Sequence, residues 1–181
     1  MLILASASPR RHELLLAAGI AHTVRPSAVP EDRHAGESPQ AFVRRLAEQK
    51  ARSVAVDFGD IVLAADTVVA LDREVFGKPG DDEDACRMLR LLGGREHSVY
   101  TGICILHKDR RIVDIARTRV RFAELSEEEI QQYVRSGEPR DKAGAYAIQG
   151  LASKFVTSVA GCYQNVVGLP VSLVYRYLKA L

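Results

Sequence analysis

Two adjacent arginines stand at the start of a predicted helix, where positive charge is unfavourable. Ser8 and Pro9 are typical of an N-cap and a first helical position, and Arg10 and Arg11 follow them directly. Because a helix N-terminus carries a partial positive charge, cations in the first turn are mildly destabilising. The same position binds anions such as phosphate. Arg10 and Arg11 therefore either extend into solvent or belong to a phosphate site.

A lysine interrupts the apolar face of the next predicted helix, which begins at Ser38-Pro39. Lys50 follows Leu46 and Val43 at helical spacing and so shares their face. A buried ammonium group is unfavourable unless it is paired. The favoured interpretation is that Lys50 reaches past the apolar face into water, and the alternative is that it points into a polar cleft.

An aspartate lies inside an almost continuous apolar run, residues 61–70, which is typical of a strand covered on both faces. A carboxylate there loses much of its solvation unless a cation or hydrogen-bond donors meet it. Asp66 is either a functional carboxylate, which we favour, or a structural residue that caps a loop. Open α/β sheets bind ligands at the carboxyl ends of their strands, where we place Asp66.

A fourth segment, residues 141–150, is rich in small residues. Gly144 and Gly150 would let the backbone approach a ligand closely, and the amide of Gln149 could read a base edge. Taken by itself, however, this segment is more typical of an ordinary tight loop.

Several common catalytic motifs are absent from the sequence. Residues 77–79, Gly-Lys-Pro, lack the upstream glycine and the Ser/Thr of a phosphate-binding P-loop. No G-x-S-x-G motif occurs, and the histidines have no metal-ligand spacing. Glu31 and Asp66 leave a hard, oxygen-ligated metal such as Mg²⁺ open.

The elements that must position these residues alternate between strands and helices, which predicts an α/β fold. Helix starts are expected at Pro9, Pro39, the acidic residues 81–84, Ser126 and Pro170. Ser126 and Glu129 form a capping-box pattern. Strands are expected over residues 2–5, 61–70, 99–106, 112–122 and 155–159, with a short return strand through Phe76 after a turn at residues 71–74.

The composition is that of an ordinary globular protein. Of the 181 residues, 47% are hydrophobic and 27% are charged, which excludes a disordered chain. The net charge of +2 argues against a nucleic-acid polymer as partner. Three cysteines without a C-x-x-C motif predict neither a disulfide framework nor structural zinc. We find no signal peptide and no apolar run of about 18 residues, and expect a cytoplasmic protein without a membrane partner.

Taken together, the motifs resemble those of the Maf family of nucleoside triphosphate pyrophosphatases, over essentially the whole chain. Single strings would be weak, but all of them occur in order and at family-like spacing. They are residues 6–11 (Ser-Ala-Ser-Pro-Arg-Arg), Glu31, the helix with Lys50, residues 65–67 (Ala-Asp-Thr), 77–79 (Gly-Lys-Pro), 141–144 (Asp-Lys-Ala-Gly), 148–150 (Ile-Gln-Gly) and 167–170 (Val-Gly-Leu-Pro).

The resemblance implies one domain over residues 1–181 with an elongated mixed sheet flanked by helices. Its two lobes would enclose a central cleft, as in inosine triphosphate pyrophosphatases. It also implies hydrolysis of the α–β phosphoanhydride to a nucleoside monophosphate and pyrophosphate, with a divalent cation, Mg²⁺ or Mn²⁺. Three positions, Arg10, Thr67 and Gln149, match the members that act on dTTP and UTP, with CTP or modified pyrimidine nucleotides left open.

The resemblance also assigns roles to individual residues. Asp66 would be the catalytic base, and Glu31 and Asp66 would hold the metal. The substrate phosphates would be bound by Ser6, Ser8, Arg11, Lys50 and Lys78. Three alternatives stay open: a 7-methyl-GTP pyrophosphatase, an inosine triphosphate pyrophosphatase, and a non-enzymatic nucleotide-binding regulator of septum formation. Whether the chain forms a homodimer is also open.

Overall fold

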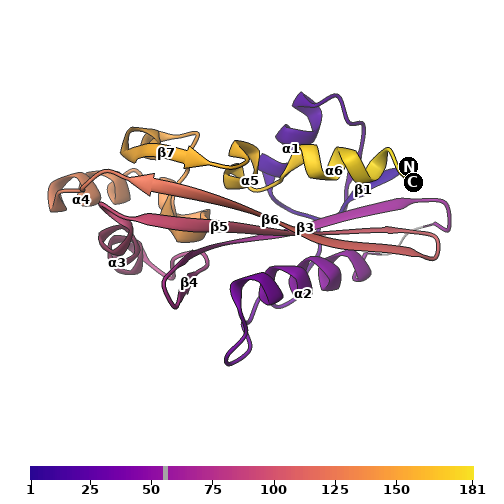
Figure 1. The fold of residues 1–181 in the computed structure, drawn as a ribbon, viewed down its shortest axis with the longest axis horizontal. Coiled ribbons are helices and arrows are strands. Elements are labelled where there is room, and N and C mark those ends of the chain that lie inside the picture. The colour runs from indigo at the N-terminus through magenta and orange to yellow at the C-terminus, as the bar shows by residue number, and fades with distance from the viewer. Residues whose placement is uncertain (55–56) are drawn as a thin grey trace. The chain divides into compact units, whose positions relative to one another are not determined.

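The computed structural model describes residues 1–54 and 57–181. Its contacts divide the chain into two compact units. The first comprises Met1–Thr67, Thr101–Ala116 and Gly168–Leu181, and the second comprises Val68–Tyr100 and Arg117–Val167. Strands β3 (Ile61–Leu71), β5 (Glu96–His107) and β6 (Arg110–Phe122) contribute residues to both units (Figure 1).

In the first unit the strand order is β2-β1-β3-β5-β6, with β1 at Leu2–Leu4 and β2 at Thr23–Val24. Strand β1 pairs in parallel with β2 and with β3, and Leu4 lies opposite Leu63. Because β1 ends at Leu4 while β3 continues to Leu71, Asp66 and Thr67 lie just beyond the end of β1. Asp66 is therefore in the middle of β3, and not at the carboxyl end where the sequence placed it.

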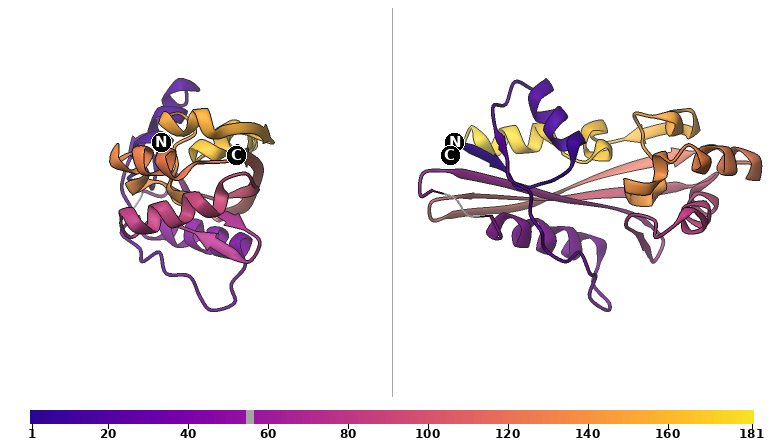
Figure 2. Two further views of the ribbon diagram at one scale, coloured as in Figure 1. Left: turned by 90° about the vertical axis from the view of Figure 1, so that its left-hand side faces the viewer. Right: turned by 180° about the vertical axis from the view of Figure 1, so that it is seen from behind.

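Helices cover both faces of this part of the sheet. Helices α1 (Pro9–Ala17) and α6 (Val171–Leu178) lie on one side of β3, and α2 (Pro39–Arg52) lies on the other (Figures 1 and 2). Leu63 and Ala65 pack in the cluster that includes Leu15 of α1 and Val174 of α6. The alternate residues of β3, Val62 and Ala64, pack in the cluster that includes Ala47 and Ala51 of α2.

A serine cap fixes the start of α2, and a glycine on β5 lets the helix approach the sheet closely. The side chain of Ser38 accepts a hydrogen bond from the Ala41 N–H and so caps the helix start, as predicted. Gly102 of β5 lies against the backbone of α2, since a Cβ atom there would come within 2.3 Å of the Val43 carbonyl oxygen. A larger residue at this position would push α2, and with it Lys50, away from the strands.

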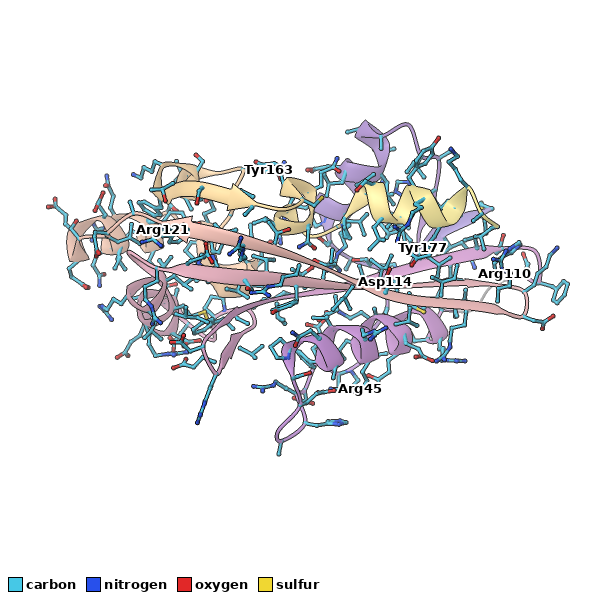
Figure 3. All side chains as sticks on the ribbon, in the orientation of Figure 1. Arg45, Arg110, Asp114, Arg121, Tyr163 and Tyr177 are labelled. Carbon is cyan, nitrogen blue, oxygen red and sulfur yellow. The ribbon has the colours of Figure 1, made fainter. Side chains whose placement is uncertain are left out.

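A side-chain hydrogen bond joins α6 to β6. The Tyr177 hydroxyl donates to Asp114 Oδ2 at 2.6 Å, and the two side chains point toward each other in Figure 3. Accepting this bond, the Asp114 carboxylate raises the pKa of Tyr177. This contact fixes the helix that follows Gly168, whose carbonyl belongs to the candidate site.

The second unit adds β4 (Glu74–Phe76), which pairs antiparallel with β3, and β7 (Val156–Ala160), which pairs antiparallel with β6. Its helices α3 (Asp82–Leu92) and α4 (Glu127–Arg135) begin where the sequence predicts, and both bonds of the Ser126–Glu129 capping box form. Three short 3-10 helices and α5 were not predicted. They are Glu138–Asp141, Ala143–Ala145, Leu151–Phe155 and α5 at Tyr163–Val167.

The α/β class, with a mixed sheet and flanking helices, is thus confirmed. The three cysteines are free, as expected. Within the described residues, no helix is both long enough and apolar enough to cross a membrane.

A histidine is buried in the aromatic core of the second unit. His97 is 2% exposed and packs edge-on against the rings of Phe122 and Tyr146. Its Nε2 atom lies 2.9 Å from the Tyr146 hydroxyl, whereas Nδ1 has no hydrogen-bond partner among the described residues. Burial lowers the pKa of His97 from 6.5 to about 4, so the ring is neutral in the folded protein at neutral pH.

We therefore expect His97 to make stability depend on pH. Between the two pKa values the unfolded chain binds a proton at His97 and the folded chain does not, so the free energy of unfolding falls as the pH decreases. Between about pH 7 and about pH 5, the wild type should lose about 2 kcal/mol more than a His97→Gln variant. Urea denaturation at both pH values measures this difference. Parallel losses in the two proteins would contradict it.

Candidate active site

The Arg11 side chain is buried at the start of α1, with only 9% of the residue exposed. Its Nε atom donates to the Gly168 carbonyl at 2.8 Å. Nη1 donates to Ser6 Oγ at 3.0 Å, and Nη2 donates to Thr67 Oγ1 at 3.1 Å. A guanidinium group carries five N–H donors. Among the described residues, one N–H on each Nη atom therefore stays available to a ligand.

Burial lowers the pKa of the Arg11 guanidinium, while the carboxylates of Asp66 and Glu31 oppose that effect. An arginine remains protonated in such surroundings. The site thus holds a fixed, desolvated positive charge, and the interpretation that both arginines extend into solvent is wrong for Arg11. Arg10, by contrast, is partly exposed.

The start of α1 presents further donors. Ser8 is the N-cap residue, as predicted, but its side chain makes no capping hydrogen bond. The Ser8 N–H instead donates to Ser6 Oγ at 3.2 Å. Because Ser6 Oγ accepts from both Ser8 and Arg11, its two lone pairs are occupied and its O–H remains to donate. Helix start, serine and guanidinium together form a surface of donors suited to an anion.

Lys50 lies between two carboxylates. Its Nζ atom is 2.6 Å from Asp66 Oδ1 and 2.6 Å from Glu31 Oε1. The lysine and Asp66 side chains are each 8% exposed, whereas the Glu31 side chain is 49% exposed. The favoured expectation that Lys50 reaches into water is therefore wrong, since its ammonium is buried and paired. Buried ion pairs of this kind lose considerable stability when one partner is removed.

Asp66 and Thr67 lie on opposite faces of β3, because successive side chains of a strand alternate. Asp66 continues the face of Val62 and Ala64 toward α2, where Lys50 meets it. Thr67 continues the opposite face toward α1, where Arg11 meets it. Neighbouring positions on one strand thus serve two different polar networks.

The loop that carries Glu31 is fastened to α2 by an arginine. Arg45 Nε and Nη2 each donate at 2.7 Å to the two carboxylate oxygens of Glu37, and Nη2 also donates to the Asp32 carbonyl at 3.0 Å. These hydrogen bonds lower the pKa of Glu37 to about 2. A two-point contact between a guanidinium and a carboxylate fixes the relative orientation of the two groups. It holds the residue next to Glu31 against the helix that carries Lys50.

Two predicted site residues, Lys78 and Gln149, belong to the second unit, and both are exposed. The segment with Lys78 is joined to residues 141–144, since the Gly144 N–H donates to the Gly77 carbonyl at 3.0 Å. The turn with Gln149 is held by Glu138, whose Oε2 accepts from the Leu151 N–H at 3.1 Å. Hydrogen bonds therefore hold the backbone segments that carry the exposed side chains of Lys78 and Gln149.

Of the ten predicted site residues, the first unit brings two sets together. One set is Ser6, Ser8, Arg11 and Thr67, and the other is Glu31, Lys50 and Asp66. Sequence reasoning missed two supports of these sets. They are Arg45 and Thr101, whose Oγ1 atom lies 2.9 Å from Thr67 Oγ1. Thr101 did carry a signal, because it is a hydroxyl in a strand that is otherwise mostly apolar, the same kind of exception that identified Asp66.

Comparison with known proteins gives the family. The model of the family described as Maf-like protein matches residues 1–181. A dTTP/UTP pyrophosphatase of Koribacter versatilis is 51% identical over 98% of this chain and 93% of its own length. One from Symbiobacterium thermophilum is 54% identical over 93% of this chain and 88% of its own length. The chain belongs to the Maf-like protein family.

Solved structures support the fold independently. The Ham1 protein of Staphylococcus aureus superposes with a TM-score of 0.54, covering 99% of this chain and 98% of that one at 15% sequence identity. A HAM1 protein from Coxiella burnetii gives a TM-score of 0.54 at 14% identity, with the same coverage. At these identities the likeness concerns the fold alone.

Proposed function

We propose that this protein is a pyrophosphatase that hydrolyses dTTP and UTP at the α–β phosphoanhydride, releasing the nucleoside monophosphate and pyrophosphate. Relatives about half identical over nearly the full chain bear the name dTTP/UTP pyrophosphatase. We further propose that residues 1–181 act as a single catalytic domain. The cytoplasm is the compartment that we expect for a reaction on free nucleotides.

The observation that carries this proposal is the meeting of donors and carboxylates near one point of β3. Arg11, Ser6 and the uncapped start of α1 offer only hydrogen-bond donors, as a phosphate requires. The carboxylates of Asp66 and Glu31 are close enough to raise the pKa of the same guanidinium. They supply the acidic groups that phosphate hydrolysis uses. Lys50 and, from the second unit, Lys78 are proposed to neutralise further phosphate charge.

The carboxylate oxygens near Lys50 are suited to bind a divalent cation. Glu31 and Asp66 present hard oxygen atoms that already converge on one cation, the Lys50 ammonium. No group of three or more metal-ligating side chains occurs among residues 1–54 and 57–181. Mg²⁺ bound through two carboxylates and substrate phosphates needs no third one. When bound, Mg²⁺ or Mn²⁺ would neutralise phosphate charge and polarise the phosphorus.

Asp66 is the proposed general base. Its Oδ1 atom accepts from Lys50, which fixes the carboxylate, and the other oxygen, Oδ2, would take the proton of the attacking water. The water oxygen forms the new bond to phosphorus, the α–β bridging bond breaks, and pyrophosphate leaves with the bridging oxygen. Arg11 and the start of α1 orient the phosphates during this step.

Arg10, Thr67 and Gln149 are the proposed base-selecting positions. Gln149 offers both a donor and an acceptor, which matches a pyrimidine edge that carries both. Thr67 contributes its small size, and Arg10 and Arg11, as successive residues of α1, project from the helix in different directions. The test compares kcat/KM for UTP, dTTP, ITP and 7-methyl-GTP in the wild type and in the triple variant Arg10→Trp, Thr67→Gln, Gln149→Glu. Wild type should favour UTP and dTTP, and the triple variant should shift toward 7-methyl-GTP. An unchanged ranking would contradict this assignment.

Removing one phosphate contact should weaken the handling of every nucleotide alike. We expect Arg11→Ala and Lys78→Ala each to cost roughly 1.5–3 kcal/mol in kcat/KM, the value of a charge-assisted hydrogen bond. The loss should be the same for UTP, dTTP and CTP, because phosphate contacts do not read the base. Lys179→Ala, at the exposed end of α6, is the control and should change nothing. A loss confined to one nucleotide would reassign the residue to base recognition.

A further inference from the structure

We propose that Thr101 is a positioning residue for phosphate binding, and that it acts through the Thr67 hydroxyl on the guanidinium of Arg11. The inference rests on the proposed function in one respect, namely that Arg11 binds substrate phosphate. It gives a role to a buried hydroxyl on β5 that the proposed reaction does not otherwise use.

The contacts form a continuous chain from β5 to the guanidinium. Thr101 Oγ1 lies 2.9 Å from Thr67 Oγ1, and Thr67 Oγ1 accepts from Arg11 Nη2 at 3.1 Å. Thr67 Oγ1 also lies 3.4 Å from the Gly168 carbonyl, the group that accepts from Arg11 Nε at 2.8 Å. Gly168 has φ +132°, a conformation that residues with a side chain rarely adopt, so the backbone that presents this carbonyl favours glycine.

Either hydroxyl of the Thr67–Thr101 pair can donate, and we propose that Thr101 does, because the one proton of Thr67 then serves the Gly168 carbonyl. A threonine hydroxyl has one proton and two lone pairs. The Gly168 carbonyl can only accept, and Arg11 can only donate. When Thr101 donates, the proton of Thr67 points to Gly168 and its two lone pairs point to Thr101 and Arg11. Every position of the Thr67 hydroxyl is then used, and none is left for a nucleotide base.

Burial restricts Thr101 to an indirect role. The residue is 0% exposed on β5, so its hydroxyl cannot touch a substrate. Thr67 projects to the face of β3 opposite Asp66, so its hydroxyl bonds Arg11, whereas Asp66 bonds Lys50. Without the donor at position 101, the Thr67 side chain loses a contact that fixes its rotamer, and its hydroxyl can rotate away from Arg11. The guanidinium then loses one of the three contacts that define its plane.

The test removes and restores the hydroxyl. Thr101→Val keeps the shape and deletes the donor, whereas Thr101→Ser keeps the donor. Binding of tripolyphosphate, measured by calorimetry without divalent metal, reports phosphate affinity with no base and no chemistry. We expect Thr101→Val to bind tripolyphosphate about three- to tenfold more weakly, the effect of one hydrogen bond, and Thr101→Ser to stay within about twofold of wild type. KM should rise by one factor for UTP, dTTP and CTP alike, with their ranking unchanged.

A matched control separates positioning from general loss of stability. Thr118 is also 0% exposed, and its hydroxyl bonds Cys162 and Asn165 in the second unit. Thr118→Val should lower the melting temperature and leave tripolyphosphate affinity as in the wild type. Equal affinity in Thr101→Val and wild type, a loss that serine does not restore, or a loss for a single nucleotide would each overturn the proposal. So would a wild type that does not bind tripolyphosphate.

Failure of the proposed function would look different. If the enzyme turned over no nucleotide, tripolyphosphate binding would still decide the role of Thr101. If nucleotides were hydrolysed while Thr101→Val bound tripolyphosphate like wild type, the role of Thr101 alone would fail.

Discussion

Asp66→Asn is expected to abolish nearly all turnover of UTP while the protein stays folded. Loss of a general base typically lowers the rate by ~10²–10⁴-fold, and by more where the same carboxylate also holds a metal. Asparagine keeps the shape of the side chain and still accepts a hydrogen bond from Lys50, which retains Glu31 as its charged partner. The loss should therefore lie in kcat, with a melting temperature near that of wild type.

Asp60→Asn is the matched control for this variant. Asp60 is also a buried aspartate of the first unit and pairs with the N-terminal ammonium at 3.0 Å, away from the proposed chemistry. Its replacement should leave kcat within about twofold of wild type, because no catalytic group is lost. Turnover by Asp66→Asn within a few-fold of wild type would contradict the assignment of Asp66 as base or metal ligand.

Of the substitutions named here, Lys50→Met should lower the free energy of unfolding most. The variant keeps the length of the side chain and removes the charge, which leaves the Asp66 carboxylate buried without its ammonium partner. Breaking one side of a buried pair typically costs ~3–5 kcal/mol, because the remaining charge is neither solvated nor neutralised. The free energy of unfolding in urea, measured with a metal chelator, checks this value.

Arg52, which lies on α2 with Lys50, is the comparison for the loss of stability in Lys50→Met. Arg52 pairs with Glu48 at 2.9 Å, but the Arg52 side chain is 59% exposed, so Arg52→Met should cost less than about 1 kcal/mol. The double variant Lys50→Met, Asp66→Asn should recover part of the loss of Lys50→Met, since the unpaired charge is gone. If Lys50→Met and Arg52→Met cost the same, the Lys50–Asp66 pair is not a buried ion pair in solution.

Most of the fold follows from local sequence. Ser38 and the Ser126–Glu129 box begin their helices as predicted, because capping is decided within four residues. Residues 117–122 alternate between arginines and the residues Thr118, Val120 and Phe122, and these three are the ones buried in β6. Strand β2, of two residues, and helix α5, of five, carry too short a pattern to be recognised.

The site was predictable as a set of exceptions, but not as an arrangement. Arg11, Lys50 and Asp66 each break the local pattern, and each is a buried charge. Their partners depend on long-range contacts. The carbonyl that holds Arg11 lies 157 residues away in sequence, and the Thr67–Thr101 contact spans 34. No local preference encodes such pairings, so the pairing of Lys50 with both carboxylates could not be foreseen, and solvent was the better physical expectation for its ammonium.

Phosphorus NMR of the reaction products shows which phosphoanhydride bond of the nucleotide is cleaved. The wild-type protein is incubated with UTP and Mg²⁺, alongside Asp66→Asn purified in the same way to exclude a contaminating enzyme. We predict UMP and inorganic pyrophosphate in equal amounts, with neither UDP nor early orthophosphate, and at least about a hundredfold slower product formation by the variant. Formation of UDP and orthophosphate, or equal turnover by both proteins, would contradict the account.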